Sequence, residues 1–216
     1  MNTPIADFLE DYEKKGMLRL HMPGHNGEAP HDITEIAGAD SLYETDSSRG
    51  IIAHSEAIAA KLFGAERTCY SAGGSTLAIQ AALAILRAQG CKTIAAGRCS
   101  HRSLVSSAAL LGLEVKWLCP KEYPSADVDC SKEALSGADA LFLTNIDYYG
   151  GTCRASDPGI PVVVDNAHGS YLKFVSKAGF GREYLHPMEF GFPVISAESA
   201  HKTLPALTGA AYLHFS

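Results

Sequence analysis

Long hydrophobic runs are missing from this chain. No apolar stretch reaches the roughly 18 residues that a membrane-spanning helix requires, so we expect a protein without a membrane segment. The N-terminus, Met1-Asn2-Thr3-Pro4, lacks the basic start and apolar stretch of a secretory signal peptide, which favours a cytoplasmic location. Basic residues are few too, because 24 Asp and Glu outnumber 18 Lys and Arg. The resulting net charge of -6 argues against a surface that binds nucleic acid.

Cysteine pairs at metal-binding spacing are missing as well. The six cysteines form no CxxC motif and lie in or beside apolar segments, which predicts reduced thiols in the interior rather than a zinc site or disulfides. His21 and His25 have HxxxH spacing, but Pro23-Gly24 between them forbids the helix that would align both rings on a metal. We therefore expect no metal site. The cysteines are Cys69, Cys91, Cys99, Cys119, Cys130 and Cys153.

What the sequence does contain is an alternation of short apolar strands and helices. Residues 1–50 show no periodicity and are predicted as an irregular N-terminal arm, and residues 51–216 as one α/β domain with a mainly parallel sheet and flanking helices. The uninterrupted run Val162-Val163-Val164 is typical of a strand covered on both faces. The predicted strands are 68–71, 92–96, 113–118, 138–144, 161–165 and 193–196; the predicted helices are one capped by Ser55 and ended by Gly64, 75–88 and 100–111.

Two of these elements carry further expectations. The helix 75–88 is apolar nearly all round, which predicts burial between two layers. The connection between Gly150 and Gly159 is rich in helix breakers and too short for the helix that usually joins two parallel strands. Either this connection is a loop, or the chain has lost a helix there.

Lys202 is the most informative single residue. It stands in the sparsely charged run Ser199-Ala200-His201-Lys202, after a predicted buried strand, and burial would free its amine for imine chemistry. Asp165 ends the predicted strand 161–165, at the carboxyl edge where ligands collect in open α/β sheets. A Schiff-base lysine and an acidic partner for a protonated pyridine nitrogen are what a pyridoxal phosphate site requires. The alternatives are a solvated surface lysine and an aspartate that only caps a helix or turn.

A glycine-rich turn before helix 75–88 offers a seat for a phosphate group. The backbone N–H of Gly74 and the helix dipole favour an anion, and Ser75 and Thr76 add hydroxyl donors. Taken alone, an ordinary strand-turn-helix with a capping serine or threonine explains the turn better. The lack of Gly-Lys-Ser/Thr argues against a nucleotide P-loop.

Three histidines complete the candidate set. His101 opens a predicted helix, where its flat ring could stack on an aromatic cofactor, although a capping or surface histidine is the simpler interpretation. His168, three residues after Asp165, could hydrogen-bond the cofactor or its substrate, or be structural. His201 shares a turn with Ser199, and both could donate to the phosphate.

Six short runs, spread over most of the chain, are His21-Met22-Pro23-Gly24-His25, Ala60-Lys61-Leu62-Phe63-Gly64-Ala65, Gly73-Gly74-Ser75-Thr76, Ser100-His101-Arg102-Ser103, Val164-Asp165-Asn166-Ala167-His168-Gly169 and Ser199-Ala200-His201-Lys202-Thr203-Leu204-Pro205. In these runs and their order the chain resembles the N-terminal and central part of the Orn/Lys/Arg decarboxylases, bacterial-type basic amino-acid decarboxylases of the aspartate-aminotransferase fold (fold type I). The Ser-x-His-Lys and Asp-x-Ala-His-Gly pair is quite specific, whereas the glycine-rich turn is weak alone.

The resemblance implies a cofactor, pyridoxal 5'-phosphate, held by Lys202 as a Schiff base and paired at its ring nitrogen with Asp165. His101 would stack on the ring, with His168 beside it. The activity implied is decarboxylation of lysine, ornithine or arginine to the amine and carbon dioxide, chemistry that belongs to polyamine biosynthesis. Such enzymes build their sites at a dimer interface, so we expect a homodimer or higher homo-oligomer. The residues implied to serve the phosphate are Gly74, Ser75, Thr76, Ser199 and His201.

The chain also departs from the family's pattern. Asn26 stands where Lys is more common, Gly209 where a polar residue such as Gln is common, and the segment before Pro161 is shorter. The chain ends at Ser216, soon after Lys202, whereas family members continue through the rest of the large domain and a smaller C-terminal domain. The alternatives are therefore another fold type I reaction, such as that of an aminotransferase or an aldolase-like enzyme, and a truncated non-catalytic remnant that folds and dimerises.

Overall fold

The computed structural model of the chain describes residues 2–16, 50–120, 126–153, 156–175 and 185–216. The chain divides into two compact units, Met1–Leu62 and Phe63–Ser216. The first unit contains helix α1 (Pro4–Lys14) and most of helix α2 (Ile51–Phe63). All candidate site residues from Gly74 to Lys202 lie in the second unit.

Both described helices of the first unit differ from the sequence-based expectation. α1 occupies part of the segment predicted as irregular, so that prediction is wrong for residues 4–14. Pro4 suits the first turn of α1 because N–H groups there have no intrahelical acceptor. α2 begins at Ile51 rather than at the predicted cap, Ser55, and Gly64 follows its last residue as expected.

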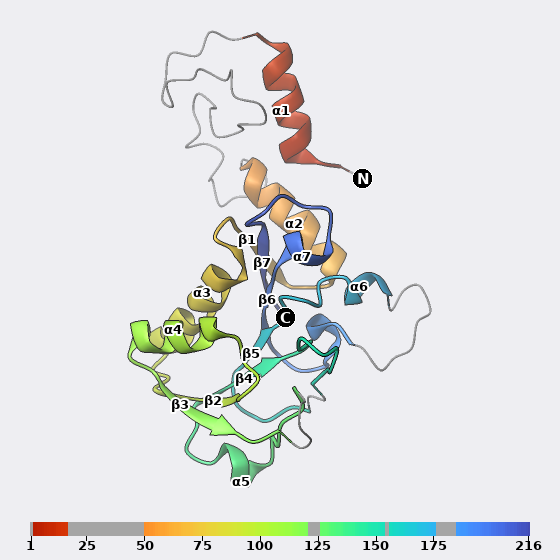
Figure 1. Cartoon of the computed structure of the whole chain (residues 1–216). Helices are drawn as coiled ribbons and strands as arrows, with labels where there is room; N and C mark the ends of the chain where they lie inside the picture. Colours follow the sequence, from red (N-terminus) through yellow and green to blue (C-terminus); the bar gives the residue numbers. More distant parts are fainter. Residues whose placement is uncertain (1, 17–49, 121–125, 154–155, 176–184) are drawn as a thin grey trace. The chain divides into compact units, whose positions relative to one another are not determined.

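A seven-stranded sheet forms the centre of the second unit (Figure 1). Its strands are β1 (Arg67–Ser71), β2 (Thr93–Gly97), β3 (Glu114–Leu118), β4 (Ala140–Thr144), β5 (Val162–Asp165), β6 (Ile195–Glu198) and β7 (Ala211–Phe215). The strand order is β1-β7-β6-β5-β4-β2-β3, with β7 antiparallel to both of its neighbours and the pairs from β6 to β3 parallel. The mainly parallel α/β fold predicted from the sequence is therefore confirmed.

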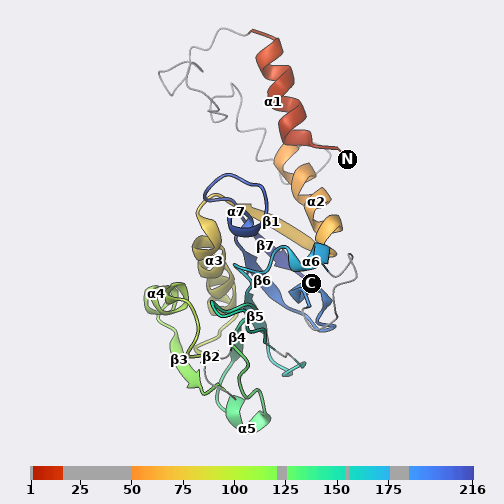
Figure 2. The ribbon, with the colours of Figure 1, turned by 45° about the vertical axis from the view of Figure 1, so that its right-hand side comes forward.

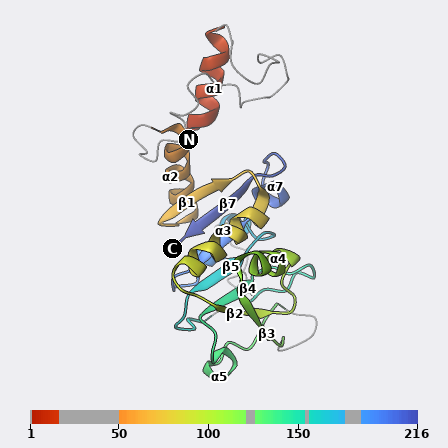
Figure 3. The same cartoon turned by 90° about the vertical axis from the view of Figure 1, so that its left-hand side faces the viewer.

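Two helices, α3 (Gly74–Ala88) and α4 (Arg102–Leu111), cover one face of this sheet (Figure 2, Figure 3). Every second residue of the strands points to this side, and the interface is almost wholly apolar. A fully buried aliphatic or aromatic side chain contributes about 1.5–3 kcal/mol here. The members of this cluster include Ile79, Leu83, Leu86, Ile94, Leu104, Phe142, Val163, Ala197 and Leu213.

The opposite face changes character along the sheet. Against β2, β4 and β5 it is apolar and is covered by residues 126–135, including helix α5 (Lys132–Leu135), and by residues 188–194. Towards β6 and β7 it becomes polar, because Ser196, Glu198 and His214 are all fully buried there. The ring of Phe63 covers this polar patch, with its centroid 4.5 Å from that of His214.

Three short helical segments belong to the connections of the second unit: α6 (Leu172–Val175), the 3-10 turn η3 (Pro187–Glu189) and α7 (Ala200–Thr203). None of them was predicted, since four or fewer residues give too little periodicity to detect. The connection from β4 to β5 contains no helix among its described residues, so it is a loop, one of the two expected outcomes. None of the helices in the described part of the chain combines the length and apolar character needed to cross a bilayer.

Three other expectations need correction. α3 is not buried on all sides, because it packs on a single sheet face and its outer side chain Leu77 is 48% exposed. β6 starts two residues later than predicted, and β7 was not predicted at all. All six cysteines are free, but only Cys91 and Cys153 are buried, and Cys119 is exposed.

Candidate active site

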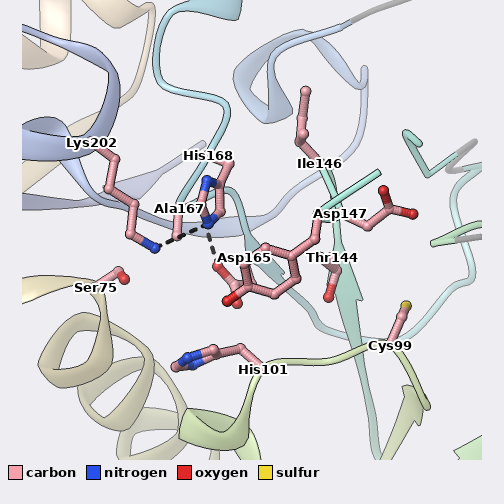
Figure 4. A pocket seen from close by; sticks show the side chains of 11 residues that line it. Ser75, Cys99, His101, Thr144, Ile146, Asp147, Asp165, Ala167, His168 and Lys202 are labelled. Carbon is pink, nitrogen blue, oxygen red and sulfur yellow. Dashed lines mark hydrogen bonds between the residues drawn. The ribbon is translucent and has the colours of Figure 1, made fainter. Parts of the chain in front are cut away.

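Five of the predicted site residues line one pocket at the carboxyl edge of the sheet (Figure 4). They come from separate elements: the start of α3, the start of α4, the end of β5, the turn after it, and α7. Parallel strands end at the same edge, so residues far apart in the chain meet there. The five are Ser75, His101, Asp165, His168 and Lys202.

Lys202 reaches the pocket from α7 and donates a hydrogen bond from Nζ to Nε2 of His168, 3.1 Å away. The ring nitrogen is the acceptor, which requires an imidazole without a proton on Nε2. Burial, and then the charges of Lys202 and His101, lower the pKa of His168, so the neutral ring is favoured. The Lys202 side chain itself is exposed, so the burial expected from its apolar sequence neighbourhood is not found.

Asp165 is 4% exposed and lies at the base of the pocket. Its Oδ1 accepts a hydrogen bond from the backbone N–H of Ala167 at 3.1 Å, so it forms a turn as well as lining the pocket. Burial raises the pKa of the Asp165 carboxyl, and this effect outweighs the lowering by the Ala167 N–H, His101 and Lys202. A cation placed against Asp165 would relieve that desolvation.

His101 combines the two roles that the sequence left open. It is the N-cap of α4, where Nδ1 accepts from the backbone N–H of Ser103 at 3.2 Å and lies 2.9 Å from the Ser103 hydroxyl. These contacts fix the plane of the ring, and the ring also lines the pocket. A capped helix end therefore presents a flat, oriented imidazole to any ligand.

The predicted phosphate seat is assembled in part. Ser75 and Ser199 are both buried, and the Ser199 hydroxyl donates to the Ser75 hydroxyl at 2.8 Å, next to the N-terminus of α3. The Gly74 N–H, in contrast, already donates to the carbonyl of Gly209 at 2.9 Å. Gly209 has φ +95° and a Cβ there would lie 2.8 Å from the Ala72 carbonyl oxygen, so glycine is what permits this close approach.

Of the five predicted phosphate ligands only Ser75 lines the pocket; besides Gly74 and Ser199, two more do not line it. Thr76 lies in the first turn of α3 with an exposed side chain. His201 points Nδ1 at the carbonyl of Ala210, 3.0 Å away, so it fastens the loop that follows α7. The run His21-Met22-Pro23-Gly24-His25 lies outside the described residues.

Six pocket residues were not predicted. They follow β2, β4 and β5, and the rule that ligands collect at strand ends could have found most of them. Tyr148 lines the pocket, and its ring centroid lies 5.3 Å from that of His168. The hydroxyl of Thr144 is buried at the pocket and has no hydrogen-bond partner among the described residues. The six are Cys99, Thr144, Ile146, Asp147, Tyr148 and Ala167.

The residues present suit pyridoxal phosphate on their own chemistry. The amine of Lys202 and the buried carboxyl of Asp165 face the same pocket, and hydroxyls cluster where the dipole of the 15-residue helix α3 attracts an anion. The buried, unpaired hydroxyl of Thr144 would find a partner in a polar atom on the ring.

Sequence comparison places these residues in a known context. No family model matches the chain. The uncharacterized protein YaaO of Bacillus subtilis is 30% identical over 99% of this chain and 49% of its own length. Arginine decarboxylase of Bacillus anthracis is 27% identical over 98% of this chain and 47% of its own length. The chain is Orn/Lys/Arg decarboxylase-like.

This decarboxylase-like chain spans about half the length of the curated relatives it matches. Its fold is also that of a solved structure, lysine decarboxylase A from Pseudomonas aeruginosa, with a TM-score of 0.71 and 18% identity over 99% of this chain and 34% of that chain. The alignment with YaaO runs over 244 positions although this chain has 216 residues, so that relative has residues without a counterpart here.

Proposed function

We propose that this chain supplies the cofactor-binding part of a pyridoxal-phosphate-dependent decarboxylase, which removes the carboxyl group of lysine, ornithine or arginine as carbon dioxide and leaves the amine. The observation that carries the proposal is the meeting of Lys202 and Asp165 at one pocket, with the lysine Nζ 3.1 Å from His168. Relatives named arginine decarboxylase support the substrate class.

When bound, pyridoxal phosphate supplies an aldehyde for an amine and a ring that withdraws electrons from a breaking bond. The residues of the chain prepare for that chemistry. His168 Nε2 accepts a hydrogen bond from Lys202 Nζ at 3.1 Å, which holds the amine at the pocket. The lowered pKa of His168 keeps Nε2 free to accept, because burial and the charges of Lys202 and His101 disfavour the protonated ring.

Asp165 and His101 would hold the ring from the two sides of the pocket that they line. An ionised Asp165 would hold a proton on the ring nitrogen, and its burial strengthens that pairing because little water competes. His101 offers the face of an imidazole whose plane is set by Ser103. Ser75, whose hydroxyl accepts from Ser199, would donate to the phosphate.

The decisive experiment is trapping of the cofactor on the purified full chain. Added pyridoxal phosphate should give a visible absorbance band, and borohydride reduction followed by mass spectrometry should place the adduct on Lys202. Lys202→Ala should abolish both signals, whereas Lys132→Ala, an exposed lysine of α5, should leave them unchanged. An adduct that survives Lys202→Ala would sink the proposal.

Reaction type is tested separately by product analysis. Carboxyl-labelled lysine, ornithine or arginine should release labelled carbon dioxide. Formation of a keto acid without carbon dioxide would point to transamination and overturn decarboxylation as the reaction.

A second candidate is cofactor binding without turnover. It is favoured by two observations: the Lys202 side chain is exposed, and the Gly74 N–H expected at the phosphate is already bonded to Gly209. A chain of this kind would show the Lys202 adduct yet release no carbon dioxide from any of the three amino acids. Turnover by the purified chain would dispose of this candidate.

Self-association belongs to the same proposal. Exposed apolar side chains on the outer side of α3 and α4, namely Leu77, Val105 and Leu110, are suited to a contact between copies. Sedimentation velocity of the full chain should show a dimer or larger species; a monomer at every concentration tested would contradict it.

A further inference from the structure

The three parallel strands β4, β5 and β6 end in side chains that alternate between two sides of the sheet. Thr144 and Asp165 are register partners and face the pocket. Because successive side chains of a strand point in opposite directions, the next residues, Asn145 and Asn166, lie behind the pocket. Glu198, at the end of β6, has the same parity as Asn166. These three side chains are buried, at 1%, 0% and 0% exposed.

The three side chains form a continuous hydrogen-bonded chain across the strand ends. Asn145 Nδ2 donates to Asn166 Oδ1 at 2.9 Å, and Asn166 Nδ2 donates to Glu198 Oε1 at 3.0 Å. Within its own strand, Ser196 Oγ donates to the same carboxylate oxygen at 3.1 Å. His186 Nε2 lies 2.8 Å from Glu198 Oε1. Each amide thus connects one strand end to the next.

The charge of Glu198 fixes which group donates and which accepts in each of these hydrogen bonds. A carboxylate only accepts, so Asn166 must turn its NH2 group to Glu198 and its carbonyl to Asn145. Asn145 must then turn its own NH2 group to Asn166. Burial raises the pKa of the Glu198 carboxyl, but His186 and then His214 lower it by more, so the pKa lies well below its ordinary value and the carboxylate stays charged.

The same series of hydrogen-bonded side chains supports the turn that carries His168. The Asn166 carbonyl accepts from the Gly169 N–H at 2.9 Å, and the turn folds back over the Asn166 side chain. The contact is so close that a Cβ at position 169 would overlap Asn166 Oδ1. Asn166 therefore touches neither pocket nor solvent, yet it borders Asp165 and supports the turn that presents His168 to Lys202.

We infer that Asn145, Asn166 and Glu198 are positioning residues, which set the spacing between Asp165 and Lys202 through hydrogen bonds on the side of the sheet away from the pocket. The inference rests on the proposed function for the meaning of that spacing. A buried carboxylate is a poor source of stability compared with apolar packing, whereas a directional series of hydrogen bonds defines one arrangement of the three strand ends. Removing the partners that orient metal ligands typically costs about 10–100-fold in affinity or activity, and we expect a loss of that order here.

The sharpest test is to exchange donor and acceptor between positions 166 and 198. Asn166→Asp places a second carboxylate against Glu198, so two acceptors meet where a donor is required. Adding Glu198→Gln reverses the contacts between the strand ends: the new carboxylate at position 166 accepts from Asn145 Nδ2 and from the new amide at position 198. The amide NH2 then also faces His186 Nε2, which lies 2.8 Å from Glu198 Oε1 in the wild type, so the recovery is partial. Ser196→Ala is the matched control, because it removes a donor to Glu198 that joins no other strand.

Two measurements are made on each full-length protein. One is hydrogen exchange of the ligand-free chain in peptides covering residues 165–169 and 199–203. The other is the Kd for pyridoxal phosphate from absorbance titration. We expect Asn166→Asp to speed exchange in both peptides and to raise the Kd about 10–100-fold. The double variant should return both quantities part of the way to the wild type, and Ser196→Ala should change both much less than Asn166→Asp does.

The outcomes separate the two proposals. The positioning role is overturned if Asn166→Asp changes neither quantity, or if the double variant is no better than the single one. Should Asn166→Asp fail to fold, recovery of folding, exchange and Kd in the double variant supports the role, and failure of both variants overturns it. A wild-type chain that takes up no pyridoxal phosphate would contradict the proposed function, while the exchange rates would still decide the positioning role.

Discussion

Two buried carboxylates stand at the ends of neighbouring strands and meet opposite surroundings. Asp165 ends β5 on the pocket side, is 4% exposed and accepts one hydrogen bond, from the Ala167 N–H. Glu198 ends β6 on the other side, is fully buried, and receives Asn166 and Ser196 with His186 at 2.8 Å. Burial raises the pKa of Asp165, whereas the histidines beside Glu198 more than offset its burial and lower its pKa.

The difference shows how burial alone does not define the role of a charge. Glu198 is surrounded by donors from its own chain, so it completes a structural network. Asp165 lacks such a set, and its carboxyl is left short of positive charge at the edge of a pocket. A buried acid at a pocket with few donors is the expected mark of a ligand site, and one that receives side-chain donors from other segments is the mark of a scaffold.

The largest expected effect comes from removing the Glu198 carboxylate. Glu198→Ala leaves His186, Asn166 and Ser196 with buried donors and no acceptor, so the free energy of unfolding should fall by about 3–5 kcal/mol. Urea denaturation measures this change. Glu133→Ala, an exposed glutamate of α5, should stay within about 0.5 kcal/mol of the wild type. A loss of similar size in both variants would contradict the distinction.

Acid should weaken the same hydrogen bonds by protonating Glu198, without the cavity that truncation to alanine creates. The folded pKa of Glu198 is lowered, so its contribution to stability is present above the unfolded value of about 4.3 and is lost as pH falls towards the folded value. The wild type should therefore lose more stability than Glu198→Gln between about pH 5 and pH 3. Melting temperatures measured across that range decide it, and parallel curves would remove Glu198 as the cause.

Asp165→Asn, in contrast, should raise the stability of the ligand-free protein at neutral pH. The raised folded pKa means that ionising Asp165 lowers stability as pH rises above its unfolded value of about 3.9. Without ligand, the asparagine variant should melt at a higher temperature than the wild type at neutral pH and show no gain near pH 3.5 or below. The same variant should bind pyridoxal phosphate at least about tenfold more weakly. A lower melting temperature at neutral pH would argue that Asp165 is already satisfied.

The smallest effects come from a matched pair of hydroxyls. Ser196→Ala removes a donor that Glu198 uses and should lower the free energy of unfolding by about 1 kcal/mol. Thr144→Val removes a buried hydroxyl that has no partner in the described part of the chain, so the ligand-free protein should be unchanged or slightly more stable. For a chain of this size 1 kcal/mol corresponds to about 2–4 °C in Tm, within reach of calorimetry. Equal losses in both variants would contradict the contrast between the two sides.

Most strands and both long helices of the second unit could be predicted because each has a local signal. Val162-Val163-Val164 is apolar without interruption, and residues 75–88 are strong helix formers. β7 has no such signal: His214 interrupts its apolar pattern, and its place between β1 and β6 depends on pairing with distant segments. α1 was missed because it lies in a segment whose neighbouring residues show no periodicity.

The candidate site divides in the same way. Lys202, Asp165, His168, His101 and Ser75 could be predicted because each follows a strand or opens a helix at the carboxyl edge. The predicted roles of these residues toward a cofactor remain predictions. Gly74, Thr76 and His201 look equally suitable in the sequence, but folding turns their donors or side chains elsewhere.

By itself the sequence determined the alternation of elements, the parallel architecture and the pairing of a lysine with an aspartate as candidates, because hydrophobic periodicity and residue chemistry are local properties. Only the tertiary structure decided which buried polar groups receive hydrogen bonds from other side chains and which face the pocket. Asn145, Asn166 and Glu198 are separated by 21 and 32 residues and meet only through the parallel register of β4, β5 and β6. Hydrogen bonding and desolvation depend on such neighbours in space, and so the contrast between Asp165 and Glu198 exists only in the folded chain.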